Sequence, residues 1–183
     1  AVMTNANWKD KYIEFNGETT YGILDKINTK AITIETTILC TKLPEDNDEC
    51  IIGDIQNDTE LLYITKGGYI KAKFKIGENE YEVTSTQKLE ENKVYGITLT
   101  YDGKNLIIYI NGKEEVKIEI KDWKQFFDNK LEIIIGAKSN KKAETDSNKD
   151  EKGSAEIKEN TMSNYFYGNM YTFSIYKDVI DKE

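Results

Sequence analysis

The densest group of side chains that could do chemistry is the acidic run at residues 44–49. Its carboxylates suit either acid–base chemistry or the binding of a hard cation such as calcium. The run begins with a proline and does not alternate between apolar and polar residues, so it predicts a turn. We take Asp46 and Asp48 as candidate ligands of a weak calcium site and expect no other cofactor. No contiguous calcium-loop pattern is present, so the alternative of ordinary solvated carboxylates stays open.

The basic side chains are of one kind, because all 25 are lysine and the sequence contains neither arginine nor histidine. Without histidine there is no imidazole to act as a general base near neutral pH or to bind a transition metal. Without arginine there is no guanidinium group for bidentate recognition of phosphate. The net charge is −8 and no basic block occurs. Nucleic acid is therefore not an expected partner.

A second group of candidates consists of tyrosines and neighbouring asparagines near predicted strand faces and ends. Sugars stack on exposed aromatic rings, and amide groups bind their hydroxyls. On this ground we name six candidate ligand-binding residues: Tyr69, Tyr109, Asn164, Tyr165, Tyr167 and Asn169. Tyrosine is also an ordinary core and strand residue of β-sandwiches, so that alternative stays open for each of them.

The two cysteines, Cys40 and Cys50, flank the acidic run, at the end of one predicted strand and the start of the next. At the base of a hairpin their Cα atoms would come within disulfide range, and we predict that they form this bond. Two free thiols are the alternative. The pair cannot make a zinc site, because other soft ligands are missing.

The elements that must position these residues are predicted to be strands. Apolar and polar residues alternate through much of the chain, for example over residues 31–39 and 69–76. The strongest signal covers residues 93–113, where alternating runs flank Asp102-Gly103 and a second reversal is expected at Asn111-Gly112. This pattern predicts an all-β sandwich or barrel. A single helical turn is expected, at residues 122–127.

The length of 183 residues fits one domain, which we predict to span residues 1–183. Residues 138–163 contain almost no apolar side chains, so this segment cannot bury enough surface to offset its ordering entropy. We expect it to be a polar, mobile insertion loop between two strands. No apolar run approaches the length of a transmembrane helix, so no membrane insertion is expected within this chain.

The order of several short motifs resembles that of laminin-G-like domains of the concanavalin A-like lectin/glucanase superfamily. An opening strand pair, a central hairpin and a closing strand carry the resemblance: Tyr12-Ile13-Glu14-Phe15-Asn16-Gly17, Ile32-Thr33-Ile34-Glu35, Ile51-Ile52-Gly53, Tyr101-Asp102-Gly103, Tyr109-Ile110-Asn111-Gly112, Ile135-Gly136, Tyr167-Gly168-Asn169-Met170 and Phe173-Ser174-Ile175-Tyr176. The family's second strand usually carries a tryptophan where Thr37 stands here. The resemblance implies a jelly-roll β-sandwich of two antiparallel sheets.

The resemblance also implies a choice among functions. Glucanases of this fold carry carboxylates spaced along one strand, and the run at residues 44–49 lacks that spacing, so we do not expect an enzyme. We expect a non-catalytic recognition module of the adhesion class, which binds a glycan or a surface protein. Its expected location is extracellular or at a microbial cell surface. The first four residues do not resemble a signal peptide, so any targeting segment would have been removed or lie outside this chain.

Two other functions stay open. One is a structural role without sugar binding, as a pilin-like head or spacer of a surface filament. The other is glycoside hydrolysis, which would need paired carboxylates in a cleft.

Overall fold

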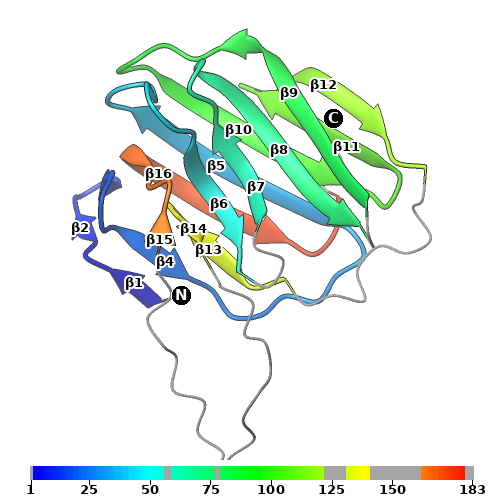
Figure 1. Cartoon of the computed structure of the whole chain (residues 1–183), viewed down its shortest axis with the longest axis horizontal. Coiled ribbons are helices and arrows are strands. Elements are labelled where there is room, and N and C mark those ends of the chain that lie inside the picture. The colour runs from blue at the N-terminus through cyan, green and yellow to red at the C-terminus, as the bar shows by residue number, and fades with distance from the viewer. Residues whose placement is uncertain (1, 56–58, 77–78, 122–130, 141–161, 180–183) are drawn as a thin grey trace, which may run out of the picture.

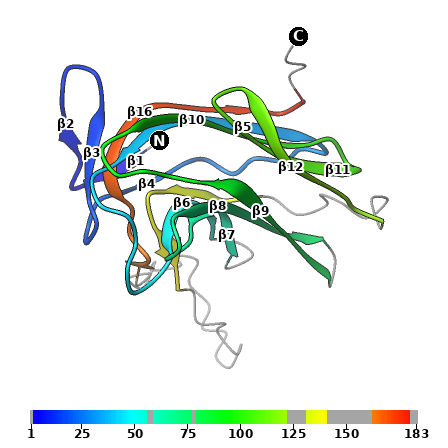
Figure 2. The same cartoon turned by 90° about the horizontal axis from the view of Figure 1, so that it is seen from above.

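The computed structural model describes residues 2–55, 59–76, 79–121, 131–140 and 162–179. Figure 1 and Figure 2 show two layers of β-strands packed face to face. The first sheet, called sheet A, has seven antiparallel strands in the order β1 (Val2–Thr4), β4 (Tyr21–Ile23), β13 (Ile133–Ile135), β6 (Glu49–Asp54), β7 (Thr59–Ile64), β8 (Tyr69–Ile76) and β9 (Asn79–Lys88).

The second sheet, called sheet B, also has seven antiparallel strands. It contains the strands that carry the first and the last of the motifs predicted from the sequence. Its strands lie in the order β12 (Lys113–Glu119), β11 (Asn105–Ile110), β10 (Val94–Tyr101), β5 (Ile32–Cys40), β16 (Tyr167–Tyr176), β3 (Ile13–Asn16) and β2 (Asn7–Trp8). The predicted all-β jelly-roll sandwich is therefore confirmed. The described residues contain no helix, and the helical turn predicted at residues 122–127 lies outside them.

The core is the layer of apolar side chains between the two sheets. On β5 it takes every second side chain, including Ile32, Ile34 and Ile38, all completely buried. Sheet A supplies the facing layer, for example Ile52 and Phe74. This is the period-two burial that the alternating sequence predicted. Among the described residues no helix is long and apolar enough to cross a membrane.

The predicted central hairpin is confirmed in detail. β10 and β11 pair with Tyr101 opposite Leu106, so the reversal lies at Asp102-Gly103. The Asp102 carboxylate accepts hydrogen bonds from the backbone N–H groups of Lys104 and Asn105, which fixes this turn. At the next reversal Asn111 and Gly112 both have positive φ, 52° and 79°, as a tight two-residue hairpin turn requires.

The predicted disulfide is not formed, and the hairpin that the prediction assumed is absent from the described residues. Cys40 ends β5 in sheet B, whereas Cys50 lies in β6 of sheet A. The intervening loop crosses from one sheet to the other instead of reversing within one. Both thiols are free and buried. Burial, and then the nearby Glu49 carboxylate, raise the pKa of Cys40 to about 12, and burial also raises the pKa of Cys50.

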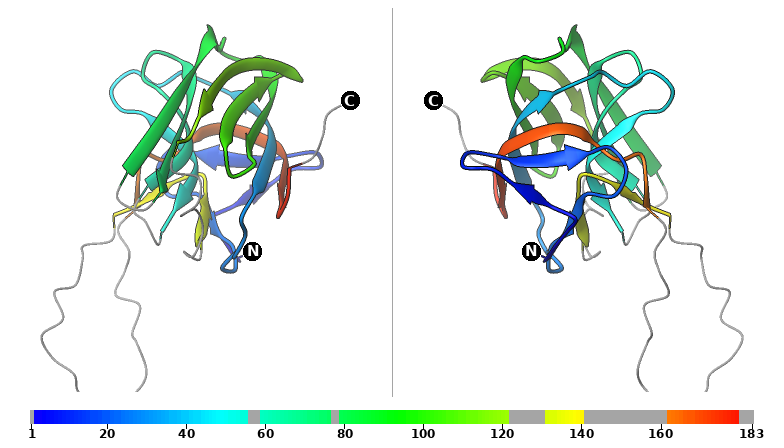
Figure 3. Two further views of the ribbon diagram at one scale, coloured as in Figure 1. Left: turned by 90° about the vertical axis from the view of Figure 1, so that its right-hand side faces the viewer. Right: turned by 90° about the vertical axis from the view of Figure 1, so that its left-hand side faces the viewer.

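The two lateral ends of the sandwich differ. At one end the edge strands β9 and β12 are joined, because the Thr86 hydroxyl donates to Glu115 Oε2 over 2.7 Å and the Gln87 N–H donates to the same oxygen over 3.1 Å. At the other end the edge strands are β1 and β2, which lie among the N-terminal strands seen in Figure 3. A pocket opens between the sheets at this second end.

The ends of the predicted insertion loop are ordered as a short strand pair. β14 (Lys138–Ser139) pairs with β15 (Met162–Ser163). Residues 141–161, the remainder of the predicted loop, lie outside the described residues.

Candidate ligand-binding pockets

The pocket at the β1–β2 end has an outer part that combines aromatic and charged side chains. We call this outer part the aromatic shelf. It encloses about 600 Å³ and is lined by Trp8, Lys9, Asp10, Lys11, Tyr12 and Tyr171. The shelf is the turn between β2 and β3, closed by a hydrogen bond from the Lys9 N–H to the Tyr12 carbonyl, with part of β16 beside it.

Trp8 is the most exposed aromatic side chain among the described residues, with 67% of its surface accessible. It lies on β2, a two-residue strand at the edge of sheet B that no other strand of the described residues covers. A ring of this size is normally mostly buried, so an exposed tryptophan at the mouth of a pocket indicates a contact surface for a ligand.

Tyr171 reaches the shelf because of a β-bulge in β16. Met170 pairs with Ile38 and Thr172 pairs with Thr37, so Tyr171 is an extra residue with no partner on β5. A bulge redirects the side chain at the inserted position. The ring of Tyr171 consequently packs against Tyr12, with 5.4 Å between ring centroids and 54° between ring planes.

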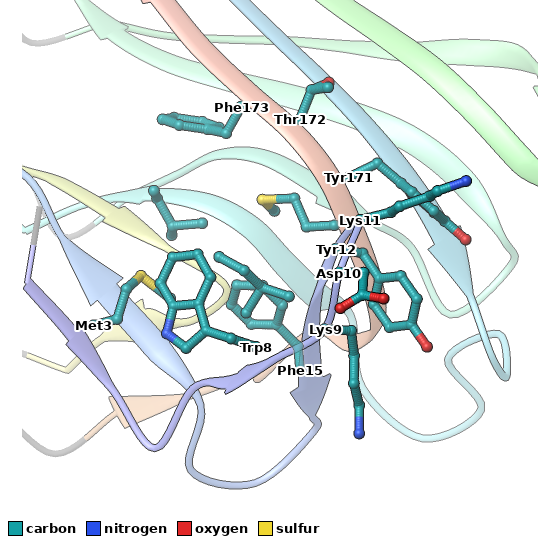
Figure 4. A pocket seen from close by; sticks show the side chains of 13 residues that line it. Met3, Trp8, Lys9, Asp10, Lys11, Tyr12, Phe15, Tyr171, Thr172 and Phe173 are labelled. Carbon is teal, nitrogen blue, oxygen red and sulfur yellow. The ribbon is translucent and has the colours of Figure 1, made fainter.

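Below the shelf the hollow continues inward between the two sheets. This inner chamber encloses about 320 Å³, and it adds one polar residue, Thr172, and six apolar residues: Met3, Ile13, Phe15, Ile135, Met170 and Phe173. Figure 4 shows the Trp8 indole beside Met3 and Phe15, with Asp10, Lys11, Tyr12 and Tyr171 grouped on the other side. We call the shelf and the inner chamber together the aromatic pocket.

Two of the three charged side chains of the shelf are available to bind a ligand. Lys9 lies 3.6 Å from Glu14 Oε2, which also accepts a hydrogen bond from the Asn7 side chain. Asp10 and Lys11 make no side-chain hydrogen bond or ion pair within the described part of the chain. These two groups can therefore bind a ligand's hydroxyls without first breaking a protein contact.

A second hollow, of about 310 Å³, lies at the acidic loop. This rim pocket is lined by Gly17, residues 42–49, Asn164, Tyr165 and Tyr167. It brings both calcium candidates, Asp46 and Asp48, together with three of the six ligand-binding candidates.

Most polar groups of the rim pocket are occupied by the protein itself. Asp48 Oδ1 accepts a hydrogen bond from the Lys66 N–H over 2.8 Å, and the Asn164 amide donates to Glu60 over 2.6 Å. Lys42 pairs with Glu45 over 2.8 Å. These contacts hold the loop and the start of β16 against the sandwich, so the rim residues act first as structural groups.

Glu49 is the unusual titratable group of the rim pocket. Its half-buried carboxylate accepts a hydrogen bond from the Tyr167 N–H over 3.0 Å. Burial raises the pKa of Glu49 to about 7, because removing water penalises the charged form more than this one hydrogen bond stabilises it. The rim pocket therefore changes its charge near neutral pH.

The other three ligand-binding candidates lie apart from both pockets. Tyr69 begins β8, Tyr109 lies in β11, and Asn169 lies in β16 opposite Glu14. All three are half-buried. Sequence reasoning missed Trp8, Tyr12 and Tyr171. A tryptophan beside the charged turn Lys9-Asp10-Lys11 was a readable signal, whereas the bulge at Tyr171 was not.

The calcium prediction for Asp46 and Asp48 stays a prediction. The described residues contain no group of three or more cysteine, aspartate or glutamate side chains placed to hold a metal ion. Asp48 already uses one carboxylate oxygen on a backbone N–H group.

Comparison with solved structures gives several similar folds at low sequence identity. The Ruminococcus gnavus sialidase module CBM40 bound to α2,3 sialyllactose matches with a TM-score of 0.64 and 14% identity, over 94% of this chain and 92% of that one. A heptameric SAP-like pentraxin from Limulus polyphemus matches with a TM-score of 0.63 and 12% identity, over 93% and 77% of the two chains.

A third similar structure is that of botulinum neurotoxin type C, whose cell entry depends on interaction with two ganglioside molecules. It has a TM-score of 0.65 and 16% identity over 97% of this chain, which spans only 42% of the neurotoxin chain. A search of curated protein sequences gave no match. These structural likenesses concern the fold.

The solved structures do not show to which family the chain belongs, but a family model does. The model of a laminin-G-type domain, described as the concanavalin A-like lectin/glucanases superfamily, matches residues 9–151. This range includes most of the motifs that suggested the resemblance. The chain belongs to the concanavalin A-like lectin/glucanase superfamily.

Proposed function

We propose that the chain is a non-catalytic glycan-recognition module that binds its ligand in the aromatic pocket. The observation that carries the proposal is the 67% exposed Trp8 ring at the mouth of a hollow that also presents Asp10 and Lys11. A pyranose ring has an apolar face and polar edges, so a flat aromatic ring with polar groups beside it matches its chemistry. Similar structures that bind sialyllactose or interact with gangliosides support the same class of ligand.

The proposal includes a location outside the cell or at its surface, where glycans and glycan-bearing proteins are the available partners. Adhesion is the broad role. The alternative of a structural filament head without sugar binding gives a different outcome in the same experiment.

The experiment is a glycan array probed with the wild-type chain, the Trp8→Ala variant and a Tyr176→Ala control. Tyr176 is 39% exposed and lies outside both pockets, so it matches Trp8 as a surface aromatic. We expect the wild type and the control to bind at least one class of glycan in common. The Trp8→Ala variant should bind the same glycans with at least tenfold lower affinity. Absence of any glycan hit would overturn the proposal and favour the structural role.

Glycoside hydrolysis is the second candidate, because the superfamily includes glucanases and Glu49 has the raised pKa of a general acid. Among the described residues a single carboxylate, Asp10, lines the aromatic pocket, whereas hydrolysis uses two. Incubating the wild type with its glycan hits should release no new reducing ends. Release that is lost in Glu49→Gln would show that the rim pocket is catalytic.

A further inference from the structure

The deeper part of the aromatic pocket adds mainly apolar side chains to those of the shelf, and these added walls restrict the ligand. The charged side chains Lys9, Asp10 and Lys11 line both parts of the pocket. The inner chamber adds six apolar side chains and one hydroxyl. All six residues of the shelf also line the inner chamber, so a ligand on the shelf reaches directly into the chamber.

The walls of the inner chamber come from both sheets. Met3 and Ile135 belong to sheet A, whereas Phe15, Met170 and Phe173 belong to sheet B. Phe15, Ile135 and Met170 are at most 5% exposed, so these walls belong to the core. Its apolar walls favour apolar groups of a ligand.

The hydroxyl that the inner chamber adds to those of the shelf is already engaged. Thr172 Oγ1 donates to the Thr37 hydroxyl over 2.9 Å. A sugar hydroxyl placed against Phe15, Ile135 and Met170 would lose hydrogen bonds to water and find no polar side chain among these three to replace them. These apolar walls therefore suit an apolar substituent of a sugar better than a hydroxyl.

We propose that the ligand of the aromatic pocket is an acylated sugar. Its ring lies on the shelf against Trp8, with hydroxyls toward Asp10 and Lys11, and its acyl group enters the inner chamber. This inference rests on the proposed glycan recognition and adds the substituent that the site selects. N-acyl and O-acyl sugars share the chemistry, since both present a short apolar chain on a polar ring.

The test compares sugars that differ only in the acyl group. N,N′-diacetylchitobiose and cellobiose are both neutral β1,4-linked disaccharides. The first carries acetamido groups at the positions where the second carries hydroxyl groups. The same comparison applies to any array hit and its chemically deacylated form. We expect the acylated member of each binding pair to bind at least tenfold more tightly. Binding of a pair with equal affinity would overturn the acyl proposal and leave glycan recognition standing.

The three methionines of the chain give a direct readout of the inner chamber. Met3 and Met170 line it, whereas Met162 lies on β15 and packs against a separate cluster around Ile55 and Ile134. In protein labelled at the methionine methyl groups, the acylated ligand should shift the NMR signals of Met3 and Met170 and leave that of Met162 unchanged. A bound ligand that shifts neither Met3 nor Met170 would contradict the proposal.

Acyl length provides a second measurement that needs no variant. Each methylene that enters an apolar site should strengthen binding roughly threefold to fourfold until the chamber is filled. We therefore expect N-propionyl and N-butyryl derivatives of a bound amino sugar to exceed the N-acetyl form. Affinity that falls steadily with acyl length would place the acyl group outside the chamber. If no sugar of either kind binds, the acyl proposal and glycan recognition fail together.

Discussion

The aromatic pocket and the rim pocket are both rich in polar and aromatic side chains, but only one of them leaves those groups available. In the rim pocket Asp48, Glu49 and Asn164 are bound to other parts of the chain. In the aromatic pocket Trp8 is largely exposed, and Asp10 and Lys11 have no partner among the described side chains and backbone groups. Residue types alone favoured the rim pocket as the ligand-binding site, whereas the availability of the polar and aromatic groups favours the aromatic pocket.

The two pockets share structural support. Phe15 forms the floor of the aromatic pocket, and its ring packs against Phe166 with 5.7 Å between centroids. Phe166 lies between Tyr165 and Tyr167 of the rim pocket. The Phe15–Phe166 contact therefore connects the proposed ligand pocket to a structural one, and the following predictions separate the two roles.

The largest effect is expected for Phe15→Ala. Phe15 is completely buried, so its removal should leave a cavity and lower the free energy of unfolding by about 3–5 kcal/mol. Chemical denaturation measures this loss. Trp8→Ala is the matched variant from the same pocket, and it should change the free energy of unfolding by less than about 0.5 kcal/mol because the ring is already exposed. A comparable loss in both variants would show that Trp8 has a structural role.

The second prediction concerns the thiols behind the rim pocket. Because burial raises the pKa of both Cys40 and Cys50, alkylation of the native protein at pH 8 should be at least about a hundredfold slower than alkylation of the unfolded chain. Unfolding without reductant should expose two reactive thiols. If reductant were needed to obtain them, the predicted disulfide would exist after all.

The third prediction uses the pKa of Glu49. Its pKa of about 7 in the folded chain exceeds the ordinary value of 4.5, so the folded state binds more protons between these two pH values. The free energy of unfolding should therefore fall as pH rises from about 4.5 to about 7, by about 1–2 kcal/mol after allowance for solvent screening. Glu49→Gln should remove this part of the pH dependence and be more stable than the wild type at pH 8. An unchanged pH profile in the variant would contradict the burial argument.

A smaller effect is expected for Tyr167→Ala. Tyr167 is 39% exposed in the rim pocket, and isothermal titration should show glycan affinity within twofold of the wild type. Thermal unfolding serves as its folding control. An affinity loss as large as that of Trp8→Ala would move the binding site to the rim.

The smallest effect is expected for calcium. The described part of the chain contributes one carboxylate to the aromatic pocket, so removal of calcium with a chelator should change glycan affinity by less than twofold. The same titration in Asp46→Asn and Asp48→Asn tests the predicted weak site. Calcium-dependent glycan binding that these variants abolish would connect the rim pocket to recognition.

The alternating pattern and the turn residues were enough to predict the fold. Asp102-Gly103 and Asn111-Gly112 lie at reversals, and the strands between them pair as expected, because these signals depend on residues close in the sequence. The disulfide prediction failed because the strand with which another strand pairs is determined by residues far away in the sequence. Nothing near Cys40 or Cys50 indicates that the loop between them changes sheets.

The candidate site was predictable only in part. The sequence grouped Asp46 and Asp48 in one loop and placed Asn164, Tyr165 and Tyr167 close together, and the fold brings these two groups into one rim pocket. It could not show that their polar atoms would be occupied there, because the partners Lys66 and Glu60 are far away in the chain.

The sequence by itself determined the class of fold, the positions of the tight turns and the absence of imidazole and guanidinium chemistry. Those properties depend on composition and on short-range periodicity. The tertiary structure alone decided that Trp8 stays exposed on an edge strand and that a bulge turns Tyr171 toward Tyr12. It also placed an apolar chamber behind them, because Met3 and Ile135 of one sheet meet Phe15 and Met170 of the other only when the sandwich closes.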